Sequence, residues 1–358
     1  MRATVVLLCL VGGISLAVAC VDTSGLFDGI SDGGSDALSG DSATPVDSSV
    51  DSRVPPGPDA KDDARSDAAD SATDSADSAD AQGDSADARN DSEKPPLTCV
   101  ADPTYVSPLA VPEVSAAAVV ELNGTRFLYV LGDSGNNGRG LLEDLATGAR
   151  SRLDLPLDTA ASDDIEGMTQ HAGILYTITS SGAVREFVPG GSAFTQSIPA
   201  YPIAPPPFSC PNLLDVNCGK NLEGICLSAV RSAEGCDGYL ASKAEGRLYC
   251  VVMTAQGRLS INAGVPPITL ALPATALSDC AFGSEGSAYG QVLVIATNGA
   301  DGNMSYRVDP ATGALTPLFA AGTTSTEAIA LDPAGRLYLV ADTATTPSPG
   351  ARFVCTGW

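Results

Sequence analysis

Short apolar segments alternate with turns through residues 99–358, and no stretch keeps the i, i+3, i+4 apolar spacing of a helix for three turns. Each repeat has an apolar segment with an acid near its start, then a turn, then a segment of aromatic and β-branched residues. This pattern predicts paired β-strands. The first segments are 113–117, 164–168, 221–225, 278–281 and 326–329, and the second are 127–130, 174–177, 238–240, 291–294 and 336–339.

The acids near the segment starts recur at a nearly constant interval. Glu113, Glu166, Glu223, Asp279 and Glu327 are separated by 53, 57, 56 and 48 residues. That period, with four strands in each, is typical of β-propeller blades. We therefore predict an all-β fold, a five-bladed propeller over residues 99–358, with six blades as the alternative. The segment before the first repeat is expected to complete the last blade and close the ring.

The first residues predict export. An uncharged apolar run over 5–18 follows Arg2 and is too short for a membrane span, so residues 1–19 are expected to be a signal peptide. Ala17-Val18-Ala19 precedes Cys20, and this resembles the lipobox of bacterial lipoproteins, although Ala17 stands where Leu or Val is usual. The resemblance implies a lipid on Cys20 and a place at the cell envelope, in the outer membrane or at the cell surface. A plain secreted protein cut at the same bond is the alternative.

The charge is concentrated between the signal and the repeats. The chain has a formal net charge of −24, and residues 21–98 hold 18 Asp and one Glu against five Lys and Arg. Such a segment buries too little to fold, so residues 20–98 are predicted to be a disordered tether. The acidic balance argues against nucleic acid and against a membrane contact other than the lipid anchor.

The cysteine count suits disulfides in an oxidising compartment. Ten cysteines are present, and Cys9 is expected to leave with the signal; if Cys20 carries lipid an even set of eight remains, whereas a free Cys20 would leave nine. A bond between Cys99 and Cys355 would fasten the ring closure. A bond between Cys210 and Cys218 would staple the Pro-rich loop over 201–220. Eight cysteines allow 105 pairings, and the sequence does not choose among them.

The repeated acids are the candidate site. The first strand of a propeller blade lies nearest the central axis, so equivalent carboxylates from several blades converge there. They must share protons, accept backbone N–H groups or bind a cation, and carboxylate oxygens suit Ca²⁺. Structural hydrogen bonding, calcium binding and acid–base catalysis all stay open. The candidate calcium ligands are Asp133, Glu166, Glu223, Asp279 and Glu327, and Asp164 lies beside them in sequence.

A family resemblance supports the same reading. Pro112-Glu113-Val114-Ser115, Gly132-Asp133-Ser134-Gly135-Asn136 and Asp164-Ile165-Glu166-Gly167 are similar to motifs of the phytase-like, "esterase-like" bacterial β-propellers. The similarity covers about 55 residues well and departs at Ala116, where the family has Gly. It implies the propeller fold and a divalent cation, and it leaves the activity open.

No catalytic residue is assigned from the sequence. Gly132-Asp133-Ser134-Gly135 is similar to the nucleophile segments of trypsin-like proteases and GDS-type lipases, but both need a histidine base. His171 is the single histidine of the chain, and it lies at an expected hairpin turn. We predict a binding or scaffold propeller that presents a rim to an extracellular ligand or an envelope protein. The alternative is a Ca²⁺-dependent hydrolase acting outside the cytoplasm on a phosphoester, an ester or a lactone.

Overall fold

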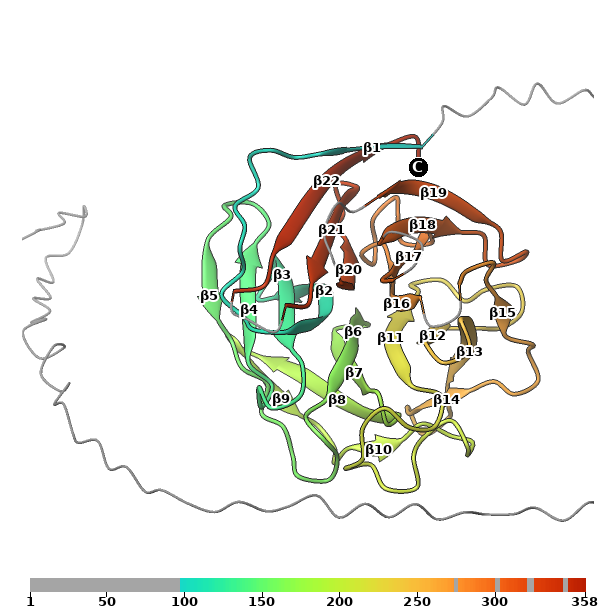
Figure 1. Cartoon of the computed structure of the whole chain (residues 1–358). Helices are drawn as coiled ribbons and strands as arrows, with labels where there is room; N and C mark the ends of the chain where they lie inside the picture. Colours follow the sequence, from blue (N-terminus) through green and yellow to red (C-terminus); the bar gives the residue numbers. More distant parts are fainter. Residues whose placement is uncertain (1–96, 274–275, 300–302, 321–324, 344–346) are drawn as a thin grey trace, which may run out of the picture. The chain divides into compact units, whose positions relative to one another are not determined.

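The computed structural model describes residues 97–273, 276–299, 303–320, 325–343 and 347–358. All regular elements in these ranges are β-strands, and they form five antiparallel sheets arranged as the blades of a propeller (Figure 1). This confirms the all-β class and the five blades. The predicted signal peptide, Cys20 and the tether as far as residue 96 lie outside the described residues.

Each blade has four strands in its main path, with one further short strand in blades 2 and 3. Blade 1 consists of β2 (Val114–Leu122), β3 (Thr125–Gly132), β4 (Gly140–Asp144) and β5 (Arg150–Arg152). Blade 2 consists of β6 (Ile165–His171), β7 (Ile174–Thr179), β8 (Ala183–Gly190), β9 (Ala193–Gln196) and β10 (Tyr201–Pro202). Blade 3 consists of β11 (Leu222–Leu227), β12 (Gly238–Ser242), β13 (Arg247–Met253), β14 (Leu259–Ile261) and β15 (Ile268–Thr269).

Blade 4 is a simple meander, and blade 5 is assembled from both ends of the described chain. Blade 4 consists of β16 (Leu277–Phe282), β17 (Leu293–Thr297), β18 (Met304–Val308) and β19 (Leu315–Ala320). Blade 5 consists of β20 (Thr326–Leu331), β21 (Arg336–Ala341), β22 (Gly350–Thr356) and β1 (Thr98–Ala101). In Figure 1, β1 runs beside β22 at the outer edge of the ring.

The ring closes as the sequence pattern predicts, because the chain before the first repeat supplies the closing strand β1. β1 pairs with β22 so that Cys99 lies opposite Cys355, and a disulfide joins them. Asp102 adds an ion pair with Arg352 at 2.7 Å. The closure therefore consists of one strand, one covalent bond and one half-buried ion pair.

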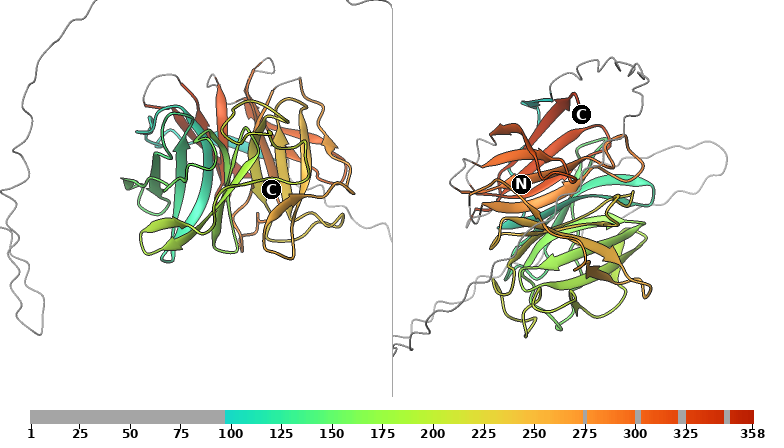
Figure 2. Two further views of the ribbon diagram at one scale, coloured as in Figure 1. Left: turned by 90° about the horizontal axis from the view of Figure 1, so that it is seen from below. Right: turned by 90° about the vertical axis from the view of Figure 1, so that its right-hand side faces the viewer.

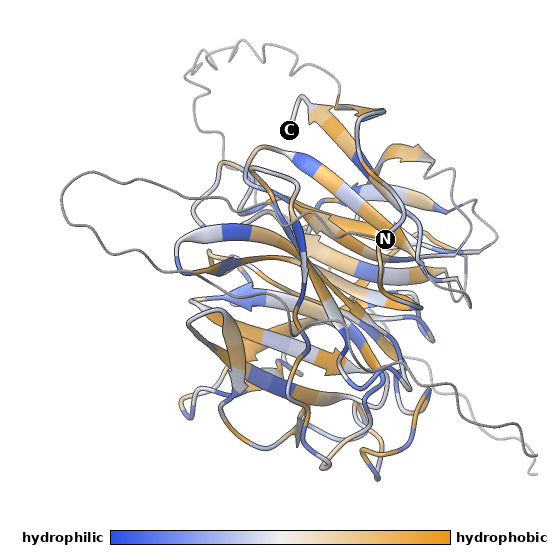
Figure 3. Ribbon diagram, turned by 90° about the vertical axis from the view of Figure 1, so that its left-hand side faces the viewer, coloured by the Kyte–Doolittle hydropathy of each residue, from blue (hydrophilic) through white to orange (hydrophobic). Residues whose placement is uncertain are grey.

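The hydrophobic core lies between neighbouring blades. The part of the chain that the structure describes contains five buried clusters, and each joins two adjacent blades, so that every blade is packed on both faces. Hydrophobic residues, orange in Figure 3, are accordingly concentrated in the strands. Burial of these two faces explains the continuous apolar runs in the inner strands, because strands covered on both sides do not alternate with polar residues.

The five inner strands β2, β6, β11, β16 and β20 surround the axis and contact one another in that order (Figure 1). Figure 2 shows the same propeller from two further sides. Small residues allow this close approach. A Cβ added to Gly167 of β6 would lie 2.6 Å from the Cα of Gly224 in β11, and one added to Gly224 would collide with Asp279 of β16. Blades 2, 3 and 4 therefore meet almost backbone to backbone at the axis.

Four disulfides are present among the described residues, and they include the two pairings named from the sequence. Cys99 is bonded to Cys355, Cys210 to Cys218, Cys226 to Cys280 and Cys236 to Cys250. The Cys226–Cys280 bond joins β11 to β16, and so links blades 3 and 4. Four disulfides point to an oxidising compartment outside the cytoplasm.

No helix in the described part of the chain has the length and apolar character needed to cross a membrane.

Candidate axial carboxylate site

Every blade contributes three residues to one end of the axis. They are the residue before the inner strand, a bulged residue at its start, and the residue after the second strand. In each blade the N–H of the third donates to the carbonyl of the first, at 2.7–3.3 Å. In blade order the first set is Glu113, Asp164, Asn221, Ala276 and Ser325, the second is Ser115, Glu166, Glu223, Ser278 and Glu327, and the third is Asp133, Ser180, Lys243, Asn298 and Asp342.

The bulged residue marks the structurally equivalent position in all five inner strands. In all five inner strands the pairing with the second strand shifts at the same place, which leaves one residue unpaired. Glu166, Glu223 and Glu327 occupy that position, but Ser115 and Ser278 occupy it in blades 1 and 4. The interval counted along the sequence places Glu113 and Asp279 in one set with Glu166, Glu223 and Glu327. In the structure, Glu113 lies two residues before the bulge of its strand and Asp279 lies one residue after the bulge of its own. Side-chain chemistry alone could not show this offset.

Three carboxylates gather on the side of blades 1 and 2. One oxygen each from Asp133, Asp164 and Glu166 lies within 4.8 Å of the others, and we call this group the carboxylate triad. Burial raises the pKa of Asp133 to about 7, with a further contribution from Asp164. Burial and then Glu223 raise the pKa of Glu166 well above its ordinary value. Among the described residues, none of the three forms an ion pair with Lys or Arg.

Two further carboxylates on the side of blades 3 to 5 share a lysine. The Nζ of Lys243 lies 3.0 Å from Glu223 Oε2 and 3.9 Å from Glu327 Oε2. Burial would lower the pKa of Lys243, but the two carboxylates outweigh it and raise that pKa. Burial raises the pKa of Glu223 despite the lysine, and it raises the pKa of Glu327 to about 7. Asn298 also donates to Glu327.

Asp279 is held by backbone groups. It is fully buried; its Oδ1 accepts the N–H of Cys280 at 2.7 Å, and its Oδ2 accepts the N–H of Ile329 at 2.9 Å. Ser115 makes the corresponding tie between blades 1 and 2, because its hydroxyl donates to the carbonyl of Ile165. Both residues therefore join one blade to the next through hydrogen bonds, which is the structural alternative that the sequence left open.

Three oxygen atoms at this end of the axis are buried and have no hydrogen-bond partner among the described residues. They are Asn221 Oδ1, Ser278 Oγ and Asp342 Oδ1, one from each set of positions. A buried oxygen without a partner loses its hydration with no compensation. Carboxylate, amide and hydroxyl oxygens without His or Cys form a donor set that suits a hard cation such as Ca²⁺ and not zinc or copper. The residues therefore fit a hydrated divalent cation.

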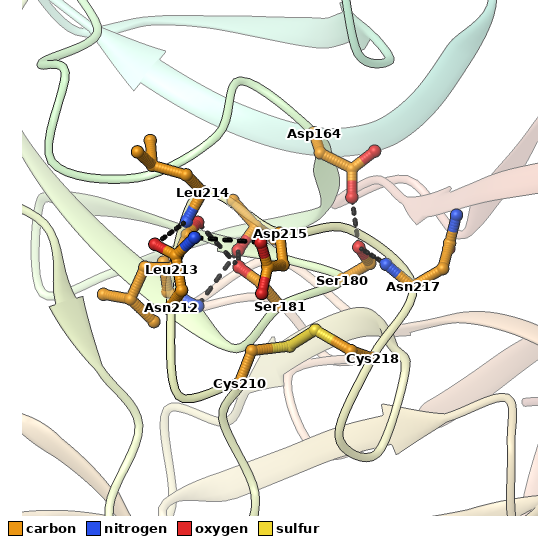
Figure 4. The surroundings of a disulfide bond; sticks show 12 residues. Asp164, Ser180, Ser181, Cys210, Asn212, Leu213, Leu214, Asp215, Asn217 and Cys218 are labelled. Atoms are coloured by element: carbon orange, nitrogen blue, oxygen red, sulfur yellow. Dashed lines mark hydrogen bonds between the residues drawn. A yellow bond between two sulfur atoms is a disulfide. The ribbon is translucent and has the colours of Figure 1, made fainter.

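A loop between β10 and β11 covers part of this end. It contains the Cys210–Cys218 disulfide and lies against the turn that carries Ser180 and Ser181 (Figure 4). The hydroxyl of Ser180 donates to Asp164, and the N–H of Asn217 donates to the same hydroxyl at 2.8 Å. The loop predicted over 201–220 thus reaches the carboxylate triad through one buried serine.

The single histidine lies at the other end of the axis. His171 is the last residue of β6, five positions after Glu166 and so roughly 17 Å from it along a strand. There it lines a cavity of about 540 Å³ with the final residues of the other inner strands. Ser134 follows Asp133 in an exposed turn at the carboxylate end. A Ser134–His171 pair is therefore not formed, in agreement with the rejection of a serine hydrolase from the sequence.

The site residues predicted from the sequence do not include Lys243, Asn298 or Ser180. Each is the first residue after the second strand of its blade, the place that Asp133 holds in blade 1. Aligning the blades on the ends of their second strands, instead of on the acids, would have found them.

No protein-family model matches the chain, and no curated protein matches it. Similar solved structures include a glutaminyl cyclase from Myxococcus xanthus, at 14% identity over 73% of this chain and 98% of that chain, with a TM-score of 0.41. A putative 6-phosphogluconolactonase from Bacteroides uniformis is similar at 15% identity over 66% of this chain and 80% of that chain, with a TM-score of 0.40. A virginiamycin B lyase from Staphylococcus aureus is similar at 13% identity over 72% of this chain and 73% of that chain, with a TM-score of 0.34. Values this low carry no inference about activity.

Proposed function

We propose that this protein is an exported binding module, anchored at the cell envelope by a lipid on Cys20, whose axial site holds a divalent cation and takes its ligand above that cation. The observation that carries the proposal is the carboxylate triad, which gathers three acids within 4.8 Å without a basic partner among the described residues. The ligand would be an extracellular molecule or an envelope protein that reaches the rim of this end.

The electrostatics of the triad favour a cation. Like charges at this separation in a buried site cannot all stay ionised, so the acids either take up protons or bind a positive ion. The raised pKa values of Asp133 and Glu166 describe the first state. Ca²⁺ would produce the second, held by Asp133, Asp164 and Glu166, and its charge would attract oxygen atoms of a ligand.

The location rests on different features. The four disulfides suit an oxidising compartment, and the acidic segment over 21–98 would hold the propeller away from a membrane surface. A binding role is favoured because the single histidine, His171, lies at the other end of the axis and is too distant to act as a base at the carboxylate end.

A cation-dependent stability tests the proposal. The full chain, carrying Cys20→Ser to avoid the lipid, would be melted with millimolar Ca²⁺ and with EDTA. At a hundredfold excess over its Kd, the ion should stabilise the fold by about 2.7 kcal/mol. Glu166→Gln should remove the shift, whereas Glu121→Gln, the same change near the other mouth of the axis, should keep it. An identical melting temperature in Ca²⁺ and EDTA would refute the cation site.

A calcium-dependent hydrolase is the second candidate, and one observation favours it. Burial raises the pKa of Glu327 to about 7, which suits a general base at neutral pH, and Glu327 holds the same bulged position in blade 5 that Glu166 holds in blade 2. The bound cation would supply Lewis-acid chemistry, and Glu327 would accept the proton of an attacking water. Turnover of model phosphoesters, esters or lactones that needs Ca²⁺ and is lost in Glu327→Gln would establish this role; its absence would leave the binding module.

A further inference from the structure

The loop over residues 210–218, closed by its disulfide, is attached to the turn after β7. The N–H of Cys210 donates to the carbonyl of Ser181 at 2.8 Å, and the carbonyl of Leu213 accepts the N–H of Ser162 at 2.9 Å and the hydroxyl of Ser181 at 3.2 Å. Gly182, with φ of 81°, allows this approach, because a Cβ there would lie 2.8 Å from the Cα of Ser209. The loop and the turn therefore form one packed unit.

A directed chain of hydrogen bonds leads from this loop to the carboxylate triad (Figure 4). The N–H of Asn217, next to Cys218, donates to Ser180 Oγ at 2.8 Å, and Ser180 Oγ donates to Asp164 Oδ2. A hydroxyl has one proton, so a serine that accepts from the loop and donates to Asp164 has its orientation fixed. Ser180 is fully buried and Asp164 is 3% exposed, so water does not compete for either bond.

We propose that the 210–218 loop positions Asp164 for the cation through Ser180, so that the closed loop sets the cation affinity of the axial site. This inference rests on the proposed function. Ser180 is a positioning residue: it binds Oδ2 of Asp164, whose carboxylate has an oxygen within 4.8 Å of Asp133 and Glu166. Partners that orient a metal-binding side chain in this way contribute roughly 10- to 100-fold to metal affinity.

The test is calcium titration calorimetry on the full chain carrying Cys20→Ser. Ser180→Ala should weaken Ca²⁺ binding by at least about tenfold, because Asp164 loses its orienting donor. The double variant Cys210→Ser, Cys218→Ser should weaken it similarly. Ser242→Ala is the matched control, since Ser242 is an equally buried serine near the end of a second strand whose hydroxyl donates to the Lys220 carbonyl at 2.6 Å. It should leave the affinity unchanged.

Combining the variants separates this mechanism from a general loss of structure. If the loop acts through Ser180, opening the disulfide in the Ser180→Ala background should weaken binding no further, giving a non-additive cycle. Additive losses, or a Ser242→Ala loss equal to that of Ser180→Ala, would overturn the inference. Melting in EDTA identifies variants that fail to fold, and a two-glycine insertion after Leu214 loosens the loop with all cysteines retained.

The result also distinguishes this inference from the proposed function. If the wild-type protein binds no Ca²⁺, both the axial cation site and the positioning role of Ser180 are refuted. Wild-type protein that binds Ca²⁺ together with loop and Ser180 variants of unchanged affinity would refute the positioning role alone.

Discussion

Two groups of carboxylates face the same end of the propeller axis, and only one of them has its own cation. Glu223 and Glu327 share Lys243, which lies 3.0 Å and 3.9 Å from them. Asp133, Asp164 and Glu166 have no such partner among the described residues, although they lie within 4.8 Å of one another. Lys243 supplies a fixed positive charge to one side of the axis, whereas the other side needs protons or an external ion.

The difference arises from a single set of equivalent positions. The residue after the second strand is Asp133 in blade 1, Ser180 in blade 2 and Lys243 in blade 3. The backbone is the same in each case, since the N–H of this residue always donates to the residue before the inner strand. Fivefold geometry thus supplies the positions, and the side chains placed on them divide the site into a half that contains a lysine and a half that has no basic partner among the described residues.

Removing the lysine should have the largest effect. Lys243→Met leaves Glu223 and Glu327 without a counter-charge, and we expect a loss of about 3 kcal/mol in the free energy of unfolding at pH 7, measured by urea unfolding in EDTA. Lys220→Met is the control, because its partner Glu245 is more exposed and the pair should contribute at most about 1 kcal/mol. Millimolar Ca²⁺ should restore more stability to Lys243→Met than to wild type; equal gains would contradict the internal counter-charge.

The two halves should respond differently to calcium. At a hundredfold excess over the Kd, Glu223→Gln should keep most of the roughly 2.7 kcal/mol of stabilisation, because the ion is held by the triad, whereas Glu166→Gln should lose it. Thermal melting with Ca²⁺ and with EDTA measures both. Loss of the response in both variants would show that the ion bridges the two halves, which would then act as a single site.

Without a cation, the protein should lose stability as the pH rises from 4.5 to 7. Burial raises the pKa of Glu327 from 4.5 to about 7, so over this interval the unfolded chain has released a proton that the folded chain still holds. The folded state binds more protons, and the free energy of unfolding therefore falls, by roughly 2 kcal/mol for this group after allowance for its partial exposure. Below pH 4.5 the contribution is fully present.

Chemical unfolding in EDTA across this pH range measures the effect. Glu327→Gln has no proton to lose there, so its stability should change less than that of wild type. Saturating Ca²⁺ should also flatten the wild-type profile, since the ion takes the place of protons on the neighbouring acids. A wild-type profile in EDTA that rises from pH 4.5 to 7 would contradict the raised pKa values of the axial carboxylates.

Asp279 should give the smallest effect and a purely structural one. Its two oxygens accept the N–H groups of Cys280 and Ile329, so Asp279→Asn keeps one acceptor and should cost about 1 kcal/mol in the free energy of unfolding. The Ca²⁺ shift in melting temperature should stay as in wild type. A lost shift would instead place Asp279 among the cation ligands, as the sequence interval alone suggested.

The strand pattern was readable without the structure because it is local. Apolar runs such as 127–130 and 336–339, with turns between them, depend only on which residues favour a twice-buried strand. The acid interval gave the blade count, since one blade repeats one chain segment. The closing disulfide was also a reasonable expectation, because Cys99 and Cys355 flank the first and last parts of a ring whose ends must meet.

The register and the pairing of charges depended on the tertiary structure. Ser115 and Ser278 hold the bulged position in blades 1 and 4, so Glu113 and Asp279 lie outside the set formed by Glu166, Glu223 and Glu327. No side-chain pattern marks where a bulge falls. Lys243 meets Glu327 from two blades away only after the ring has closed, and Ser180 meets Asn217 only after the loop has folded back. Local sequence sets strands by propensity and burial, whereas contacts across the axis exist only once distant blades share it.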